Sequence, residues 1–203
     1  MPAAPELTTE EACLIVDKLY EVGILWLGLS GGEPFMRSDF ESIYRYARSK
    51  GFIISILTNA SLIDERLICL FSELPPFKLE ITLNAISEQV FADICESEQT
   101  IAHVITVIDM LHRARVPMKI KTQKMNVNAH DLEYIHKFAN KRNIPFSFSD
   151  RIYARVNGDH FPTTLRVSLH DSGEGICHER LHASQRFFSC AVHSGGNICV
   201  DPS

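Results

Sequence analysis

The chain has 203 residues, of which 45% are hydrophobic and 22% charged, and this composition suits one sizeable globular core. The formal net charge is -5 and no cluster of lysines and arginines stands out. A nucleic-acid partner is therefore disfavoured, because phosphate binding needs a basic face. No apolar run reaches membrane-spanning length, and the N-terminus lacks a signal-peptide pattern. We expect a cytoplasmic protein without a membrane partner, whose six cysteines are reduced thiols or metal ligands.

Five strand-like runs alternate with helical segments along residues 1–150. The runs cover residues 25–29, 52–57, 79–83, 118–121 and 144–148. Several are almost continuously apolar, as is typical of parallel strands that are covered on both faces. The alternation predicts an α/β fold with a parallel sheet and right-handed crossovers.

Helix-start signals precede the amphipathic segments between these runs. Thr8 and Ser38 each begin a capping box with a glutamate three residues later. The next three helices are predicted to begin at Asp64, Thr100 and Asn128. After Ser149 the pattern decays, so we predict a boundary near Asp150, with one domain over residues 1–150 and a linker and tail over residues 151–203.

Small or polar groups follow all five strand-like runs, at the ends where ligands gather in parallel α/β folds. The most informative of these ends is Ser30-Gly31-Gly32-Glu33-Pro34. Its glycines let a ligand approach the backbone, and its carboxylate suits an ammonium group. A tight strand-to-helix turn with a solvated glutamate is the alternative interpretation.

Residues 6–65, 78–94 and 118–149 resemble the radical S-adenosylmethionine (SAM) superfamily in the order and spacing of their elements. The matching features are a capped helix, an apolar strand, GGEP, a second capped helix, a strand and TNxxxI. The resemblance implies a partial (β/α)6 barrel, similar to a TIM barrel. Its first strand, which precedes the segment equivalent to Glu6, would be missing here, leaving an open sheet edge.

The resemblance also implies cofactor-binding roles. The GGEP backbone and Glu33 would bind the amino group of SAM, while the polar groups that end the next strands would contact SAM or substrate. The implied residues are Gly31, Gly32, Glu33, Pro34, Thr58, Asn59 and Asn84, with Lys121 and Thr122 as weaker candidates. The alternative for the residues after Pro34 is a polar strand end facing water or a loop.

Two departures from the family pattern are visible. Ala60 stands where the family usually has glycine after TN, a small loss of backbone freedom. More seriously, no cysteines show the CxxxCxxC spacing that holds the family's [4Fe–4S] cluster. We therefore expect the chain as given to lack SAM-cleaving activity, with Met1 an internal start or the start of a fragment. The cysteines at 13, 69 and 95 fall in helical patterns and are interpreted as buried thiols.

Residues 187–203 resemble the beginning of a SPASM domain, an extension that binds auxiliary iron–sulfur clusters in radical SAM peptide maturases. Cys190 matches the first ligand of that domain, and residues 198–202 match its strand and turn. The SPASM-like segment is truncated, because the chain ends before the next cysteine would come. A zinc site among the tail's cysteines and histidines is the competing interpretation, although the spacings match no short zinc motif.

Two functions remain open at this point. The first is a radical SAM enzyme that forms a 5′-deoxyadenosyl radical and modifies a peptide or metabolite, with a flavodoxin or ferredoxin as reductant. The second is a non-catalytic module that binds SAM or a peptide. An ordinary methyltransferase is disfavoured, because Leu57-Thr58-Asn59 ends its strand without the carboxylate that would bind ribose.

Overall fold

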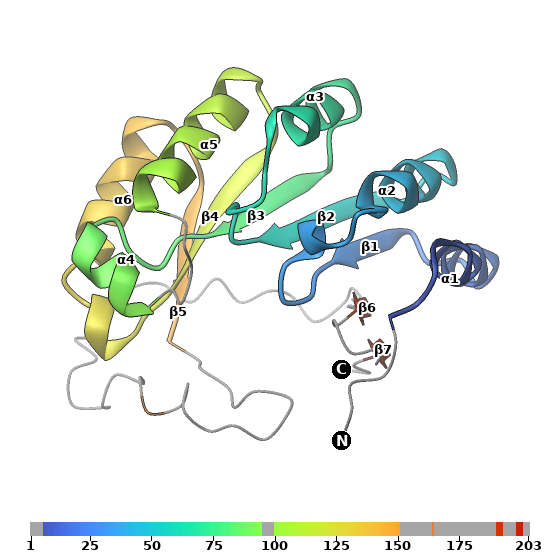
Figure 1. Ribbon diagram of the computed structural model, residues 1–203, viewed down its shortest axis with the longest axis horizontal. Coiled ribbons are helices and arrows are strands. Elements are labelled where there is room, and N and C mark those ends of the chain that lie inside the picture. Colours follow the sequence, from blue (N-terminus) through green and yellow to red (C-terminus); the bar gives the residue numbers. More distant parts are fainter. Residues whose placement is uncertain (1–5, 95–99, 151–163, 165–189, 193–197, 201–203) are drawn as a thin grey trace. The chain divides into compact units, whose positions relative to one another are not determined.

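The computed structural model describes residues 6–94, 100–150, 164, 190–192 and 198–200 (Figure 1). Residue contacts divide the chain into two compact units. The first contains the residues up to Ile81 together with Val107–Met118 and the C-terminal segment from Arg186, and the second contains Thr82–Thr106 and Lys119–Gln185. The predicted boundary near Asp150 adjoins residues outside the described ranges and stays a prediction.

Five strands of the described residues form one sheet in the order β1-β2-β3-β4-β5, as the predicted α/β class requires. They are β1 (Trp26–Leu29), β2 (Ile53–Thr58), β3 (Lys78–Thr82), β4 (Met118–Gln123) and β5 (Phe146–Ser149). The pairs β1–β2, β2–β3 and β4–β5 are parallel. All five strand-like runs are therefore confirmed, with bounds shifted by no more than a few residues.

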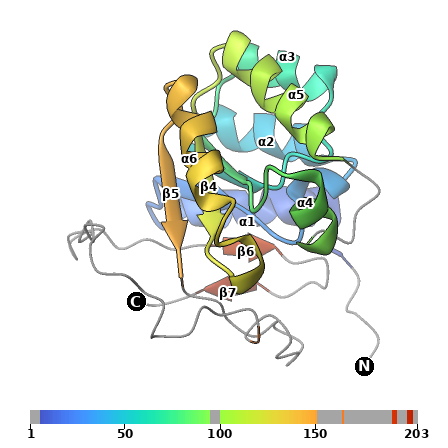
Figure 2. The same cartoon turned by 90° about the vertical axis from the view of Figure 1, so that its left-hand side faces the viewer.

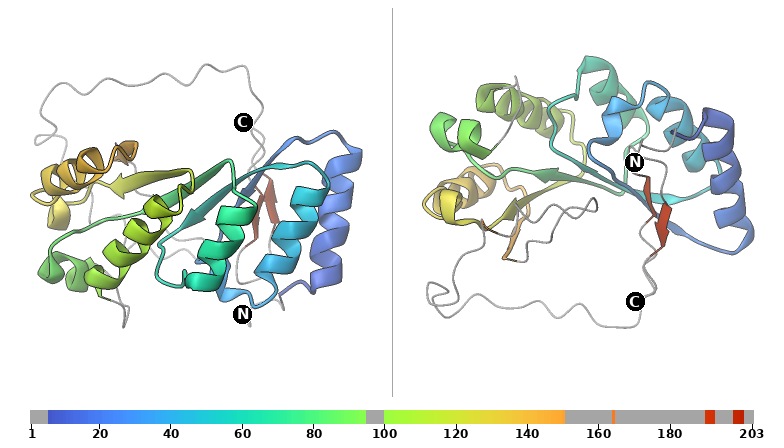
Figure 3. Two further views of the ribbon diagram at one scale, coloured as in Figure 1. Left: turned by 90° about the horizontal axis from the view of Figure 1, so that it is seen from above. Right: turned by 60° about the horizontal axis from the view of Figure 1, so that its bottom comes forward.

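Three α-helices accompany the strands of the first unit and form a row on one side of β1 and β2 (Figure 3). They are α1 (Thr9–Glu21), α2 (Phe40–Ser49) and α3 (Glu65–Glu73), and a short 3-10 helix, η1 (Pro34–Met36), follows β1. An aromatic cluster fills the space between them. Tyr44 is fully buried, stacks on Phe40 and meets Phe71 edge-on, and its hydroxyl donates to Leu74 O over 2.8 Å.

Burial alternates along β2, because successive side chains point to opposite faces, whereas Leu79, Glu80 and Ile81 on β3 are all buried. Ile54, Ile56, Leu79 and Ile81 are fully buried on the helix-covered face. The other face is more polar: it carries Gly28 on β1, Ser55 on β2, and Lys78 and Glu80 on β3.

In the second unit, β4 and β5 run side by side with α6 against them (Figure 2). The helices that begin there are α4 (Glu88–Ile94), α5 (Ile101–Arg113), the 3-10 turn η2 (Asn126–Asn128) and α6 (Leu132–Lys141). Asn128 is fully buried: its Oδ1 accepts from Met125 N at 2.8 Å, and its Nδ2 donates to Asn84 O at 2.7 Å and Gln123 O at 2.8 Å.

Three predicted helix caps are confirmed. The Thr8 capping box is present, Asp64 Oδ1 accepts from Leu67 N at 2.9 Å, and Thr100 Oγ1 accepts from His103 N at 3.3 Å.

Two predicted caps are wrong. The box at Ser38 does not form: the N-cap is Asp39, whose carboxylate bonds to other groups instead of the helix backbone. Asn128 does not cap α6, which begins after Asp131, because its amide is used in the contacts described above.

The C-terminal residues that the structure describes are β6 (Cys190–Val192) and β7 (Ile198–Val200), which pair antiparallel. The strand that contains Cys190 is therefore the neighbour of the predicted strand over residues 198–200. The predicted turn at residues 201–202 lies outside the described residues.

The buried hydroxyl of Tyr44 yields a prediction. Burial raises the pKa of Tyr44 to about 12, while the charge of Arg48 opposes the shift. The unfolded chain ionises this group first as pH rises, so its contribution to stability is lost between about pH 10 and pH 12. Tyr44→Phe should lower the free energy of unfolding by about 1 kcal/mol at pH 7 and flatten the decline above pH 10. Urea titrations across pH, with exposed Tyr20→Phe as control, would contradict this if both variants behaved alike.

A second prediction concerns Asn128. Asn128→Ala leaves two part-buried carbonyls and one buried amide without their partner, so the free energy of unfolding should fall by about 3 kcal/mol. Asn140 is the matched control, because its amide only meets exposed His136 at 3.1 Å in α6. Asn140→Ala should change stability by no more than about 0.5 kcal/mol in the same denaturation experiment. Equal effects of the two substitutions would refute the role given to Asn128.

Candidate functional site

The loop after β1 places a buried carboxylate at the carboxyl ends of the strands. Glu33 is 9% exposed and accepts three hydrogen bonds. Its Oε1 accepts from the Thr58 hydroxyl at 2.8 Å and from Phe35 N at 3.4 Å, and its Oε2 accepts from Asn59 N at 2.8 Å. The side chain of Glu33 therefore joins the end of β1 to the end of β2.

Burial raises the pKa of the Glu33 carboxyl, although the hydrogen bonds from Asn59, Thr58 and Phe35 oppose that shift. Desolvation is the stronger effect because no cation is paired with this carboxylate among the described residues. A nearby cation would stabilise the charged form of a buried carboxylate that has no cationic partner among the described residues.

The residues around Glu33 shape the approach to it. Gly31 is half-buried and Gly32 is exposed, so their backbone is accessible at the same loop. Pro34 is buried and begins η1, for which Glu33 is the N-cap. The loop thus exposes backbone on one side of Glu33 and holds it rigidly on the other.

Thr58 and Asn59 differ in what they leave available. The Thr58 hydroxyl donates to Glu33 and accepts from Ala60 N at 2.9 Å, so it is occupied in holding the carboxylate. Asn59 is exposed, and its Oδ1 accepts from Ser61 N at 2.8 Å, which leaves its Nδ2 free for a ligand. Ala60 adopts φ 63°, a left-handed conformation that glycine adopts more easily.

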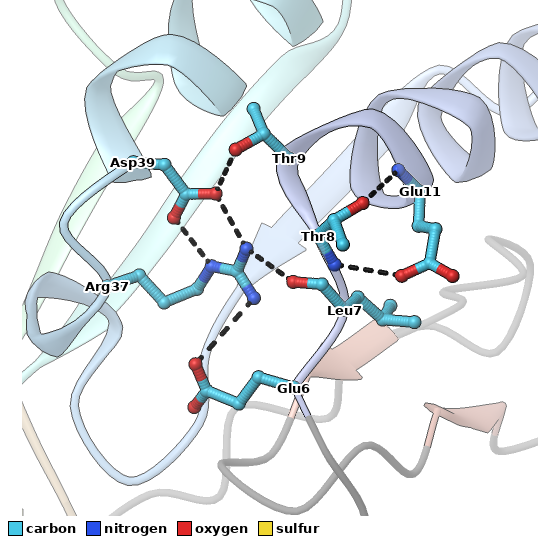
Figure 4. Close-up of polar contacts among 7 residues, drawn as sticks. All are labelled: Glu6, Leu7, Thr8, Thr9, Glu11, Arg37 and Asp39. Carbon is cyan, nitrogen blue, oxygen red and sulfur yellow. Dashed lines mark hydrogen bonds and ion pairs between the residues drawn. The ribbon is translucent and has the colours of Figure 1, made fainter.

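Arg37 ties this loop to the start of α1 (Figure 4). Its guanidinium donates to both carboxylate oxygens of Asp39, at 3.0 and 2.8 Å, and to Leu7 O at 3.0 Å. Thr9 donates to Asp39 Oδ2 at 2.7 Å. This network explains why Asp39 does not cap α2, and it anchors the segment that enters α1 beside the loop.

A cavity of about 190 Å³ lies between α1, β1 and this loop. The apolar stripe of α1 contributes Ile15 and Val16 to its lining, and the loop contributes Ser30 to Pro34. Its walls are mostly apolar, with polar groups concentrated at the loop end.

The second unit holds another set of predicted residues at the ends of β3 and β4. Asn84 is half-buried, and its Oδ1 accepts from Gln123 N at 2.8 Å. The Thr122 hydroxyl is buried and donates to Leu83 O at 2.7 Å, so it holds the backbone of the neighbouring strand. Lys121 is exposed. The Nδ2 of Asn84 donates no hydrogen bond within the described residues, so it remains available as a donor.

Asp131 is a buried polar residue that the sequence analysis missed. Its Oδ2 accepts from Ile86 N at 2.9 Å, Ser87 N at 3.0 Å and the Ser87 hydroxyl at 2.9 Å. Burial would raise the pKa of Asp131, but these hydrogen bonds lower it overall. The side chain thus fixes the loop that leads into α4. No local sequence signal reveals this role, because the partners are more than forty positions away.

In the described part of the chain, no group of three His, Cys, Asp or Glu residues is arranged so that it could hold a metal ion. Cys13 is half-buried and Cys69 is exposed, which corrects the prediction that Cys69 is a buried thiol. Cys95 lies outside the described residues. The described helices include none that is both long and apolar enough to cross a membrane.

Comparisons with known proteins place this geometry in context. The family model "Radical SAM superfamily" matches residues 1–139. Among curated proteins, the AdoMet-dependent heme synthase of Methanosarcina barkeri is 28% identical over 66% of this chain and 38% of its own length. The Fe-coproporphyrin III synthase of the same organism is 37% identical over 41% of this chain and 21% of its own length. The chain thus spans well under half of these relatives.

Solved structures share the fold at low identity. Streptococcus suis SuiB bound to S-adenosylmethionine superposes with a TM-score of 0.60 at 16% identity, over 70% of this chain and 33% of SuiB. The enzyme anSMEcpe with bound AdoMet gives 0.58 at 16% identity, over 76% of this chain and 47% of that one. The family match covers well over half of the residues and agrees with the strand order and the GGEP loop, so the chain belongs to the radical SAM superfamily.

Proposed function

We propose that this chain supplies the SAM-binding part of an enzyme that cleaves SAM reductively to a 5′-deoxyadenosyl radical. In this proposal the loop residues Gly31, Gly32, Glu33 and Pro34 receive the amino-acid end of SAM. The observation that carries it is the buried Glu33 carboxylate, held by Thr58 and Asn59 without a cationic partner in the described residues.

The hydrogen-bond capacity of Glu33 supports an ammonium ligand. A carboxylate offers about four lone-pair sites, and three are used by Thr58, Phe35 and Asn59. The remaining site is on Oε2, which accepts one bond only. An ammonium group there would form a charge-assisted hydrogen bond and offset the cost of burying the carboxylate.

The side-chain amides among the candidate residues suit oxygen atoms as ligands. In the first unit, Asn59 uses Oδ1 for a backbone amide, which leaves Nδ2 as a donor for a carboxylate or ribose oxygen. In the second unit, Asn84 uses Oδ1 in the same way and keeps Nδ2 as a donor. Thr58 is different, because its hydroxyl already bonds to Glu33 and Ala60. We therefore assign Thr58 a positioning role, holding the carboxylate.

In this family a [4Fe–4S] cluster supplies the electron for SAM cleavage. A reductant such as a flavodoxin or ferredoxin reduces that cluster. The described residues do not provide the three thiolates that such a cluster needs, and CxxxCxxC is absent from the 203 residues. We accordingly propose that the chain by itself binds SAM without cleaving it.

We propose that the substrate is a peptide or a small metabolite. The solved structures include SuiB bound to its precursor peptide SuiA, and the curated relatives are named for heme and Fe-coproporphyrin III synthesis. Residues 1–150 would form the barrel part and residues 151–203 a linker and SPASM-like segment, with Cys190 as a ligand of an auxiliary cluster. The alternative is a non-catalytic module that binds SAM or a peptide through the same strand ends.

Cluster reconstitution tests the catalytic part of this proposal. The purified 203-residue chain, treated anaerobically with iron, sulfide and a reductant, should yield no 5′-deoxyadenosine above a protein-free control. Chromatography of the quenched mixture measures that product. Sustained formation in proportion to the chain concentration would contradict the proposal.

Glu33→Gln tests the binding part. The neutral amide cannot pair with the ammonium of SAM, so the affinity for SAM should fall about tenfold to a hundredfold. Calorimetry would compare SAM with 5′-methylthioadenosine, which lacks the amino-acid end. The wild-type chain should prefer SAM, and Glu33→Gln should lose that preference. Glu41→Gln is the control, because Glu41 pairs with Arg45 on the surface of α2. Equal binding of both ligands by the wild type would count against the site.

A further inference from the structure

Arg37 lies at the opposite end of the η1 turn from Glu33. Glu33 is the N-cap of η1 and Arg37 is its C-cap, with Pro34–Met36 between them. Met36 N donates to Glu33 O at 3.2 Å and Arg37 N donates to Pro34 O at 3.3 Å, so the two residues are joined by a closed turn. Pro34 stiffens this turn further, because its ring fixes φ. A change in the orientation of Arg37 is therefore passed on to Glu33.

The side chain of Arg37 fixes its end of the turn against the start of α1 (Figure 4). It is 15% exposed and donates two parallel hydrogen bonds to the Asp39 carboxylate, at 3.0 and 2.8 Å. A guanidinium–carboxylate pair of this kind is strongly directional. The bond from Arg37 to Leu7 O, at 3.0 Å, and the bond from Thr9 to Asp39 each join residues thirty positions apart. These contacts orient Arg37 relative to α1.

Stability alone does not explain this network. Desolvation offsets much of the attraction within a part-buried ion pair, so such a pair adds little net stability. Arg37 Nη1 is also buried and makes no hydrogen bond within the described residues, because Glu6 Oε2 is 4.0 Å away. A buried donor without an acceptor costs free energy. What the network does provide is a fixed direction for the Arg37 side chain and for the turn that it ends.

Phe35 anchors the middle of the turn in a different way. Its ring packs edge-on against Phe40 with the centroids 4.7 Å apart, and it meets Phe71 at 5.9 Å. Apolar contacts of this kind hold a position but are non-directional compared with hydrogen bonds. Loss of the Arg37 side chain should therefore loosen the orientation of the turn without unfolding it.

Glu33 itself is held on the other side of the loop. Its carboxylate accepts from the Thr58 hydroxyl and from Asn59 N, both at the end of β2. Arg37 supplies the matching anchor on the α1 side. Together the two anchors fix the direction in which the remaining lone pair of Glu33 Oε2 points.

We propose that Arg37 is a positioning residue for SAM. Held by Asp39 and Leu7 O, it orients η1 so that Glu33 Oε2 faces the ammonium group of the ligand. This inference rests on the proposed function, because Glu33 is the point of contact with SAM. Arg37 itself does not contact SAM in this account: its charge is balanced by Asp39, and it acts through the turn.

Binding of SAM to the full 203-residue chain tests this role by calorimetry. Arg37→Gln removes the paired bonds, so it should weaken SAM binding about tenfold and leave binding of 5′-methylthioadenosine, which lacks the amino-acid end, unchanged. Arg37→Lys keeps the charge but not the two parallel bonds, so it should restore part of the lost affinity. Arg45→Gln is the control and should bind SAM like the wild type, because Arg45 pairs with Glu41 at 2.9 Å on the surface of α2.

Two further comparisons separate positioning from other roles. Arg37→Gln leaves the Asp39 carboxylate without its cation, and Asp39→Asn in the same chain removes that charge. Because both residues act in one network, the double variant should bind SAM no more weakly than Arg37→Gln. Decarboxylated SAM keeps the amino group but lacks the carboxylate, and its affinity should also fall about tenfold in Arg37→Gln.

The outcomes distinguish this inference from the proposed function. If the wild type binds SAM and 5′-methylthioadenosine equally, the proposed function fails and the inference fails with it. If the wild type prefers SAM and Arg37→Gln keeps that preference, the proposed function stands and the inference alone is overturned. Equal losses of affinity for both ligands, in step with a loss of thermal stability, would overturn it in favour of a purely structural role. A loss that disappears with decarboxylated SAM would overturn it in favour of direct contact between Arg37 and the SAM carboxylate.

Discussion

The hydrogen bonds of one carboxylate hold the proposed SAM loop in place. Glu33 reaches from the loop after β1 to Thr58 and Asn59 at the end of β2, where the backbone ladder between these strands no longer provides contacts. The carboxylate is buried to make this link, and burial raises its pKa. The same side chain therefore stabilises the loop and has no cationic partner among the described residues, and the proposed binding of an ammonium group rests on this feature.

In the second unit, side-chain amides and not a carboxylate join the ends of neighbouring strands. Asn128 joins Asn84 O to Gln123 O, and Gln123 N donates to the side chain of Asn84. Amides satisfy these strand ends without introducing a charge, so no ligand is needed to balance them. The contrast explains why Glu33 is the stronger candidate for recognising a cation, while Asn59 and Asn84 are better suited to neutral or anionic oxygens.

Much of the fold could be predicted from local patterns. The five strands follow from apolar runs, and the caps at Thr8 and Asp64 follow from residue type and spacing. Contacts between residues distant in sequence could not be predicted in this way. Asp39 resembles part of a helix cap but bonds to Arg37, and Asp131 gives no local signal for its link to the loop before α4. The proposed role of Glu33 comes from a family resemblance, whereas the hydrogen bonds of the Thr58 hydroxyl to Glu33 and Ala60 follow from the folded structure and not from a local sequence pattern.

The pKa of Glu33 tests the central claim most directly. Carbon-13 NMR of the labelled chain would follow the Glu33 carboxyl through a pH titration, with and without SAM. The account predicts a pKa above the ordinary value of 4.5 in the free chain, and a fall in that pKa when SAM supplies its ammonium group. An ordinary value in the free chain, or a pKa that SAM leaves unchanged, would contradict it.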